Sequence, residues 1–158
     1  LDGNPEVIVI RFGRTPNQDL DALVILCAAL KRNSLTNRRP LLALLYSKQR
    51  AVLDDLNRAG VDFVRYVGGN PLGFNDIQHI IEGLGPNDRL ETHLEAVCPF
   101  LHYSKVDSQH EMTVCGAYRD RMVLGGYRLH EICHTESHLR CEYYLNPRVK
   151  ERRFGRGY

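Results

Sequence analysis

The sequence lacks several features that mark familiar classes of protein. It contains no tryptophan, and its longest apolar stretches, Ala22–Leu30 and Leu41–Tyr46, are far shorter than the roughly 20 residues of a membrane-spanning helix. It has no P-loop and no GxGxxG motif after a predicted strand, and no two cysteines form a CxxC pair. These absences exclude a membrane span and argue against a common zinc ribbon.

The composition is that of a soluble globular protein. Of the 158 residues, 43% are hydrophobic and 25% are charged, and the net charge of +2 gives no general attraction to nucleic acid. The stretch Leu1–Asn4 is acidic and lacks the basic region before an apolar run that begins an export signal. We therefore expect a cytoplasmic protein.

The first half of the chain alternates apolar strands with amphipathic helices. The strands are predicted over Val7–Phe12, Leu41–Tyr46 and Val61–Val67, and each is followed by a helical pattern. This order predicts an α/β fold, with a small parallel sheet and flanking helices. We expect a scaffold domain over residues 1–90, a loop-rich cysteine module that binds a metal cofactor over 91–147, and a basic tail over 148–158.

Capping residues set the expected helix ends. Thr15-Pro16-Asn17-Gln18 predicts the start of a helix that runs to about Lys31, because Thr15 can cap, proline suits the first helical position and Gln18 closes a capping box. Ser47 is the expected cap of a second helix that stops at Gly60. Asn75 is the expected cap of a short third helix.

Isolated small residues in this half are interpreted as structural. Gly13 and the pair Gly68-Gly69 are predicted turns rather than a phosphate cradle. Cys27 lies on the apolar face of the first helix, and we expect it to be a small core residue rather than a redox thiol.

The other four cysteines, Cys98, Cys115, Cys133 and Cys141, all lie in the second half. Two disulfides are one option, although the chain lacks an export signal and disulfides are rare in reducing compartments. Zinc is a second option, in which His130, His134 and His138 supply ligands beside the cysteines. A [4Fe–4S] cluster is the third and favoured one, because each of its irons takes one thiolate and the ligands can come from dispersed loops.

The neighbours of these cysteines form a pattern: Cys98-Pro99-x-Leu101, Cys115-Gly116-Ala117-Tyr118-x-x-Arg121, Cys133-x-Thr135 and Cys141-x-Tyr143. It resembles the C-terminal four-cysteine module of small bacterial and archaeal proteins, many from anaerobes, to which iron–sulfur clusters are attributed. The resemblance covers the chain from Cys98 onward and does not extend to the α/β half. It implies that the four cysteines are the cluster ligands, and it implies no reaction.

The remaining polar residues of the second half have ordinary and functional interpretations. His93, His102 and His110 are expected on the surface or as caps, and His130, His134 and His138 are expected on a solvated helix face, unless they line the metal site. Four arginines could offset the charge of a thiolate-bound cluster: Arg119, Arg121, Arg128 and Arg140. We expect the tail from Arg148 to Tyr158, with its basic and aromatic residues, to be disordered or to touch phosphates or an acidic partner.

No nucleophile–base pair accompanies the cysteines, so the sequence favours an electron carrier or redox sensor that works with protein partners in a larger complex. The alternative is a zinc-stabilised interaction module that contacts nucleic acid or an acidic partner through the tail. A third hypothesis is an enzyme whose cluster has three cysteine ligands and one open iron that acts as a Lewis acid.

Overall fold

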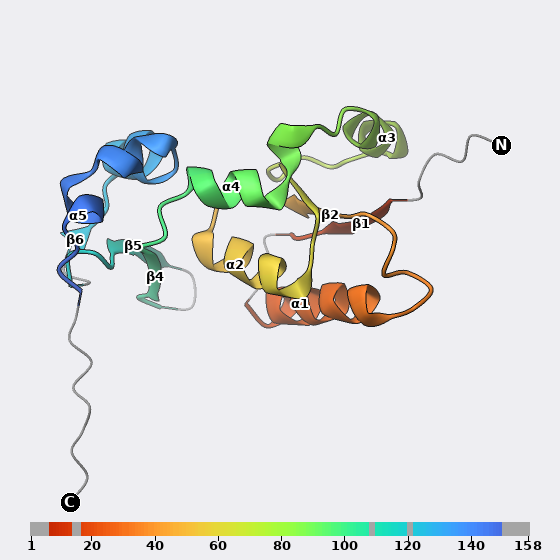
Figure 1. Cartoon of the computed structure of the whole chain (residues 1–158), viewed down its shortest axis with the longest axis horizontal. Helices are drawn as coiled ribbons and strands as arrows, with labels where there is room; N and C mark the ends of the chain where they lie inside the picture. Colours follow the sequence, from red (N-terminus) through yellow and green to blue (C-terminus); the bar gives the residue numbers. More distant parts are fainter. Residues whose placement is uncertain (1–6, 14–16, 108–109, 120–121, 150–158) are drawn as a thin grey trace, which may run out of the picture. The chain divides into compact units, whose positions relative to one another are not determined.

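The computed structural model describes residues 7–13, 17–107, 110–119 and 122–149, and the chain divides into two compact units after Glu95 (Figure 1). The N-terminal unit holds the predicted α/β scaffold. The C-terminal unit holds the four clustered cysteines of the sequence pattern. The predicted cap at Thr15 and Pro16 and most of the basic tail lie outside the described residues.

The N-terminal unit is built on a parallel three-stranded sheet, as predicted. Its strands are β1 (Ile8–Arg11), β2 (Leu41–Leu45) and β3 (Phe63–Tyr66), in the order β1-β2-β3. In the register of the sheet, Ile10 pairs with Ala43 and Ala43 pairs with Val64. All three strands are slightly shorter than the apolar runs that predicted them.

The central strand β2 is buried along its whole length, and none of its five residues is more than 2% exposed. Because successive side chains of a strand point to opposite faces, this burial requires cover on both faces of the sheet. The helices α1 (Asn17–Arg32) and α2 (Arg50–Ala59) pack against each other beside the sheet (Figure 1). The strand β2 therefore forms the centre of this unit.

Helix α2 ends where the sequence predicts and begins later than expected. Gly60 has the positive φ of 83° that favours glycine, and its N–H donates to the carbonyl of Asn57 while the next N–H, of Val61, donates to that of Leu56. This is the Schellman arrangement that ends many helices. The predicted cap at Ser47 is wrong, because the helix starts at Arg50 with Gln49 in the cap position and no side-chain cap bond.

Helix α3 (Phe74–Glu82) starts two residues earlier than a cap at Asn75 would place it, so that predicted cap is wrong. Gly73 occupies the cap position, and its N–H donates to Oδ2 of Asp76 at 2.8 Å. Asp76 belongs to the predicted capping pattern, but its carboxylate accepts from the N–H of Gly73 and not from that of Asn75. The turn at Gly68, which has a φ of 61°, follows β3 as expected.

The segment after α3 attaches to β3 through polar contacts. It contains the short 3₁₀ turn η1 (Pro86–Asp88) and helix α4 (Leu90–Ala96). Arg65 on β3 makes a two-pronged ion pair with Asp88, at 2.7 and 2.8 Å. His93 on α4 donates from Nε2 to the carbonyl oxygen of Val64 at 3.1 Å, and its ring meets that of Tyr66 edge-on. The expectation that His93 is a surface or capping residue is therefore wrong, and burial lowers its pKa.

The C-terminal unit has more regular structure than the predicted loop-rich module. An antiparallel sheet with the order β4-β5-β6 contains β4 (Leu101–Lys105), β5 (Glu111–Cys115) and β6 (Met122–Val123). After it come a π-helical turn, η2 (Arg128–Cys133), a 3₁₀ turn, η3 (Glu136–Arg140), and the one-turn helix α5 (Glu142–Leu145). None of the helices in the described residues combines the length and apolar character needed to cross a bilayer.

Shortening a side chain of β2 should destabilise the N-terminal unit. We expect Leu44→Ala to lower the free energy of unfolding by about 2–5 kcal/mol, because it removes fully buried methyl groups and leaves a cavity. Leu35→Ala is the control, since Leu35 is 81% exposed. Denaturant unfolding followed by circular dichroism measures both. Equal, small effects of the two substitutions would contradict the central position of β2.

Candidate metal centre

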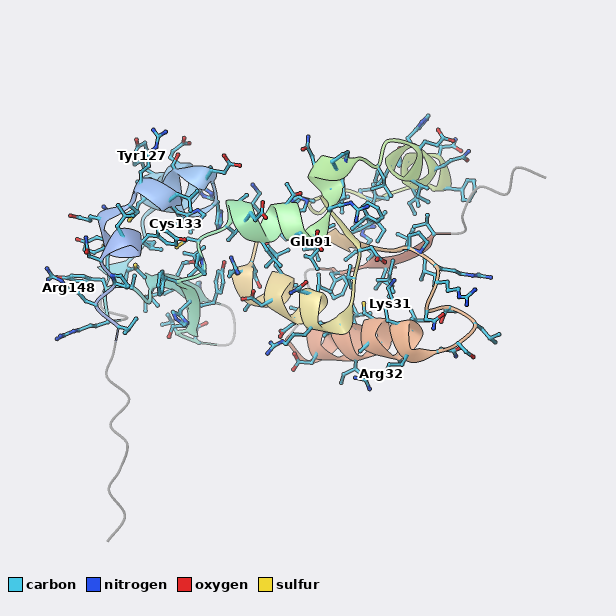
Figure 2. The ribbon with its side chains drawn as sticks, viewed as in Figure 1. Lys31, Arg32, Glu91, Tyr127, Cys133 and Arg148 are labelled. Carbon is cyan, nitrogen blue, oxygen red and sulfur yellow. The ribbon has the colours of Figure 1, made fainter. Side chains whose placement is uncertain are left out.

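The four cysteines enter the C-terminal unit from four different segments. Cys98 follows α4, Cys115 ends β5, Cys133 ends η2 and Cys141 precedes α5. Three of the side chains are buried, with exposures of 6–7%, and that of Cys141 is half-buried. Figure 2 labels Cys133 among the elements of this unit.

Backbone hydrogen bonds bring these segments together. The N–H of Cys98 donates to the carbonyl of Cys133 at 2.8 Å, which joins two cysteines far apart in the sequence. Cys115 lies opposite Leu101 in the β4–β5 pair, and the N–H of Gly116 donates to the carbonyl of Phe100 at 2.7 Å. The segment just after Cys98 is therefore tied to both Cys115 and Cys133.

Aromatic contacts join the fourth segment to the first. The ring of Tyr144, on α5, meets Phe100 edge-on at 6.1 Å between centroids and meets His138 at 5.1 Å. The N–H of Cys141 donates to the carbonyl of His138 at 3.0 Å. Edge-to-face ring pairs of this kind add to the stability of the contact.

Electrostatics shows that the four sulfurs influence one another. Burial, and to a smaller extent the charges of Cys98, Cys115 and Cys141, together raise the pKa of the Cys133 thiol from 9.0 to about 12, against an opposing effect of Arg128. In the absence of a cation at the site, Cys133 is therefore a neutral thiol. A bound cation reverses this preference, because a coordinating thiol is deprotonated outright.

Four cysteine thiols are suitable ligands for a metal that prefers sulfur, although their side chains are not arranged as a complete binding site. None of the five cysteines, all of which lie in the described residues, forms a disulfide. In the described part of the chain, no group of three or more histidine, cysteine, aspartate or glutamate side chains is arranged so that it could hold a metal ion. The chemistry and convergence of the four segments thus fit such a group, whereas the positions of the side chains do not complete a binding site.

Cys27 is separate from this cluster, as predicted. It lies on α1 in the N-terminal unit with no exposed surface, and burial raises its pKa to about 11. A thiol in this state is inert at neutral pH.

The three histidines of the zinc alternative do not share one solvated face, so that expectation is wrong for His138. Its ring is only 2% exposed, and Nδ1 donates to the carbonyl of Thr135 at 2.7 Å. His130 is exposed and His134 is half-buried, and their rings lie 5.5 Å apart. Helical structure is interrupted between η2 and η3, so His134 and His138 do not lie on one continuous helix.

The other two histidines, His102 and His110, are exposed, as expected, and His110 pairs with Asp107.

Among the described arginines singled out in the sequence, Arg128 is the one whose charge acts on a cysteine thiol. Its guanidinium lies 5.3 Å from the ring centroid of Tyr143 and donates to Sδ of Met122, and its charge lowers the pKa of Cys133. Arg119 and Arg140 are exposed, and Arg121 lies outside the described residues.

The structure also identifies a requirement at Gly116 that the sequence pattern only suggests. A Cβ at this position would overlap the ring of His102 and lie 3.0 Å from the carbonyl oxygen of Phe100. The strand β4 can therefore approach the turn after Cys115 only because residue 116 has no side chain. The glycine that directly follows Cys115 in the sequence was the available signal.

Comparisons with protein-family models, with curated proteins and with solved structures find no match to this chain.

A methyl group at Gly116 should disturb the cysteine cluster. We expect Gly116→Ala to lower the stability of the C-terminal unit by about 1–3 kcal/mol, because the backbone carbonyl of Phe100 must move. Gly125→Ala is the matched control, since nothing lies within 4 Å of a Cβ built there. Hydrogen exchange of the β4 and β5 amides measures the difference. Unchanged exchange in Gly116→Ala would contradict the close approach.

Proposed function

We propose that the C-terminal unit holds one [4Fe–4S] cluster on Cys98, Cys115, Cys133 and Cys141, and that the protein acts in electron transfer or redox sensing within a larger complex. The observation that carries this proposal is the convergence of four cysteine segments through the Cys98–Cys133 hydrogen bond, the β4–β5 pair and the contacts of Tyr144. Four cysteine thiolates are the usual ligands of such a cluster, and the bound cluster would supply the redox chemistry.

The core of the C-terminal unit supports this proposal. Among the described residues of this unit, three of the buried apolar side chains are cysteines, and the aliphatic core is thin, consisting of Val97, Leu101, Val114, Ala117 and Leu124. The N-terminal unit, by contrast, buries a continuous set of leucines and valines. A small unit with so little aliphatic core commonly needs a metal or another cross-link to be stable.

The charges around the cysteines suit a group with negative charge. Four thiolates give a cluster a net negative charge, and burial of that charge is costly unless cations or hydrogen bonds offset it. Arg128 supplies a positive charge that Tyr143 holds in place. Because the Cys133 thiol is neutral without a cation, we expect binding of the cluster to release protons.

Cysteine substitutions test the ligand set. We expect protein purified without oxygen to be brown and to contain about four irons and four sulfides per chain. Replacing Cys98, Cys115, Cys133 or Cys141 with serine should reduce the iron content strongly, and Cys27→Ser should leave it unchanged because Cys27 lies in the other unit. Iron and sulfide analysis with visible and paramagnetic-resonance spectra measures this.

The outcomes separate the hypotheses. A colourless protein without iron contradicts the cluster proposal. A full cube that survives the loss of one particular cysteine indicates three-ligand binding and revives the enzyme hypothesis, in which an open iron acts as a Lewis acid.

Zinc is the second candidate, and one observation favours it. The Nδ1–H of buried His138 donates to a backbone carbonyl, so the neutral ring presents Nε2 as an acceptor. Zinc-ligating histidines commonly donate their other N–H in this way. The protein is then a zinc-stabilised interaction module. One zinc and no iron per chain, with the zinc lost in His138→Ala, would establish this alternative.

Removal of the metal group should unfold one unit selectively. We expect treatment with an oxidant and a chelator to increase hydrogen exchange throughout β4, β5 and η2, because the thin aliphatic core cannot hold them. Exchange of the β2 amides is the internal control and should stay slow. Equal protection of the C-terminal unit before and after metal removal would contradict a structural role of the metal.

A further inference from the structure

Helix α1 carries apolar residues on the side that faces away from the sheet. Ile25 is 69% exposed and Leu26 is 45% exposed, and Ala22 and Ala29 beside them are also exposed. We call these four residues the α1 stripe. The opposite side of the helix holds Cys27, which has no exposed surface.

Helix α2 shows how an ordinary surface helix of this unit is built. It buries Leu53, Leu56 and Ala59 and turns charged residues such as Asp54 and Arg58 outward. A helix that is apolar on both sides is normally covered on both sides. The α1 stripe therefore has the character of a contact surface, like other contiguous apolar patches on folded proteins.

The stripe is symmetric along the helix. Its residues read Ala-x-x-Ile-Leu-x-x-Ala, so the order of large and small side chains is nearly the same in both directions. If a second α1 runs antiparallel to the first, Ala22 of one copy faces Ala29 of the other, and the large side chains meet at the centre. A two-fold axis produces this self-complementary arrangement.

Charged residues at the two ends of the stripe are complementary in the same arrangement. Asp21 and Arg32 are both exposed, and their separation of about three helical turns places them on one flank of the stripe. Figure 2 shows the Arg32 side chain directed away from the rest of the unit, whereas Lys31 is directed inward, where it pairs with Asp62. An antiparallel second copy brings its Arg32 to Asp21 at each end of the contact.

We propose that the α1 stripe is the contact surface of a homodimer, in which two α1 helices pack antiparallel with Ile25 and Leu26 at the centre and two Asp21–Arg32 pairs at the ends. A membrane surface suits the stripe less well, because interfacial helices carry mainly Lys and Arg on their polar flanks. Two helices alone bury less than a standard interface of about 1,600 Å². We therefore expect a dissociation constant in the micromolar range.

Sedimentation equilibrium of the full chain tests the apolar part of the contact. We expect a dimer at concentrations of about 100 μM, and Ile25→Ser with Leu26→Ser should raise the dissociation constant by about 100-fold or more. Leu35→Ser is the control, because it removes an exposed leucine outside the stripe and should leave the dimer intact. Circular dichroism checks that each variant is folded.

Charge reversal tests whether the occupant is a second copy in this orientation. Asp21→Arg and Arg32→Asp should each raise the dissociation constant by about fivefold to 30-fold, because each places like charges together twice. The double variant restores both pairs with their signs exchanged and should return to the wild-type value. A monomer at these concentrations, or a dimer that the stripe substitutions leave unchanged, overturns the proposal. Failure of the double variant to recover overturns the antiparallel arrangement.

Discussion

The hydrogen bond between Cys98 and Cys133 is the interaction on which the C-terminal unit depends most. It joins the start of the segment before β4 to the end of the π-helical turn η2, and it brings together two residues whose thiols are buried. The β4–β5 pair then adds Cys115, and the contacts of Tyr144 with Phe100 and His138 add the segment of Cys141. The centre of this unit is consequently made of sulfur and one buried imidazole as much as of hydrocarbon.

The two units differ in the origin of their stability. The N-terminal unit has an apolar central strand with both faces covered, so burial of hydrocarbon supplies the main favourable free energy. The C-terminal unit instead buries three thiols beside a thin aliphatic core. Under the proposed function, binding of the metal group would contribute directly to the folding of this unit and not of the other.

Wide turns and close approaches are concentrated around the cysteines. The N–H of His134 donates to the carbonyl of Leu129, five residues earlier, which gives η2 its π-helical form. Gly116 allows β4 to approach the turn after Cys115. Single π-helical turns and tightly packed glycines both recur at functional sites, where they place side chains that a regular helix or strand cannot.

Local patterns in the sequence were enough to predict the parallel sheet, the buried position of Cys27 and the stop of α2 at Gly60, because each depends on neighbouring residues or on a simple apolar period. The caps at Ser47 and Asn75 were mispredicted, because polar residues at several neighbouring positions can cap a helix: Gln49 holds one cap position, and Gly73, whose N–H is bound by the Asp76 carboxylate, holds the other. The antiparallel sheet β4-β5-β6, the contacts of His93 with β3, the burial of His138 and the convergence of the four cysteine segments were decided only by the tertiary structure. These features join residues that are distant in the chain, and no local period records which distant partner a residue will meet.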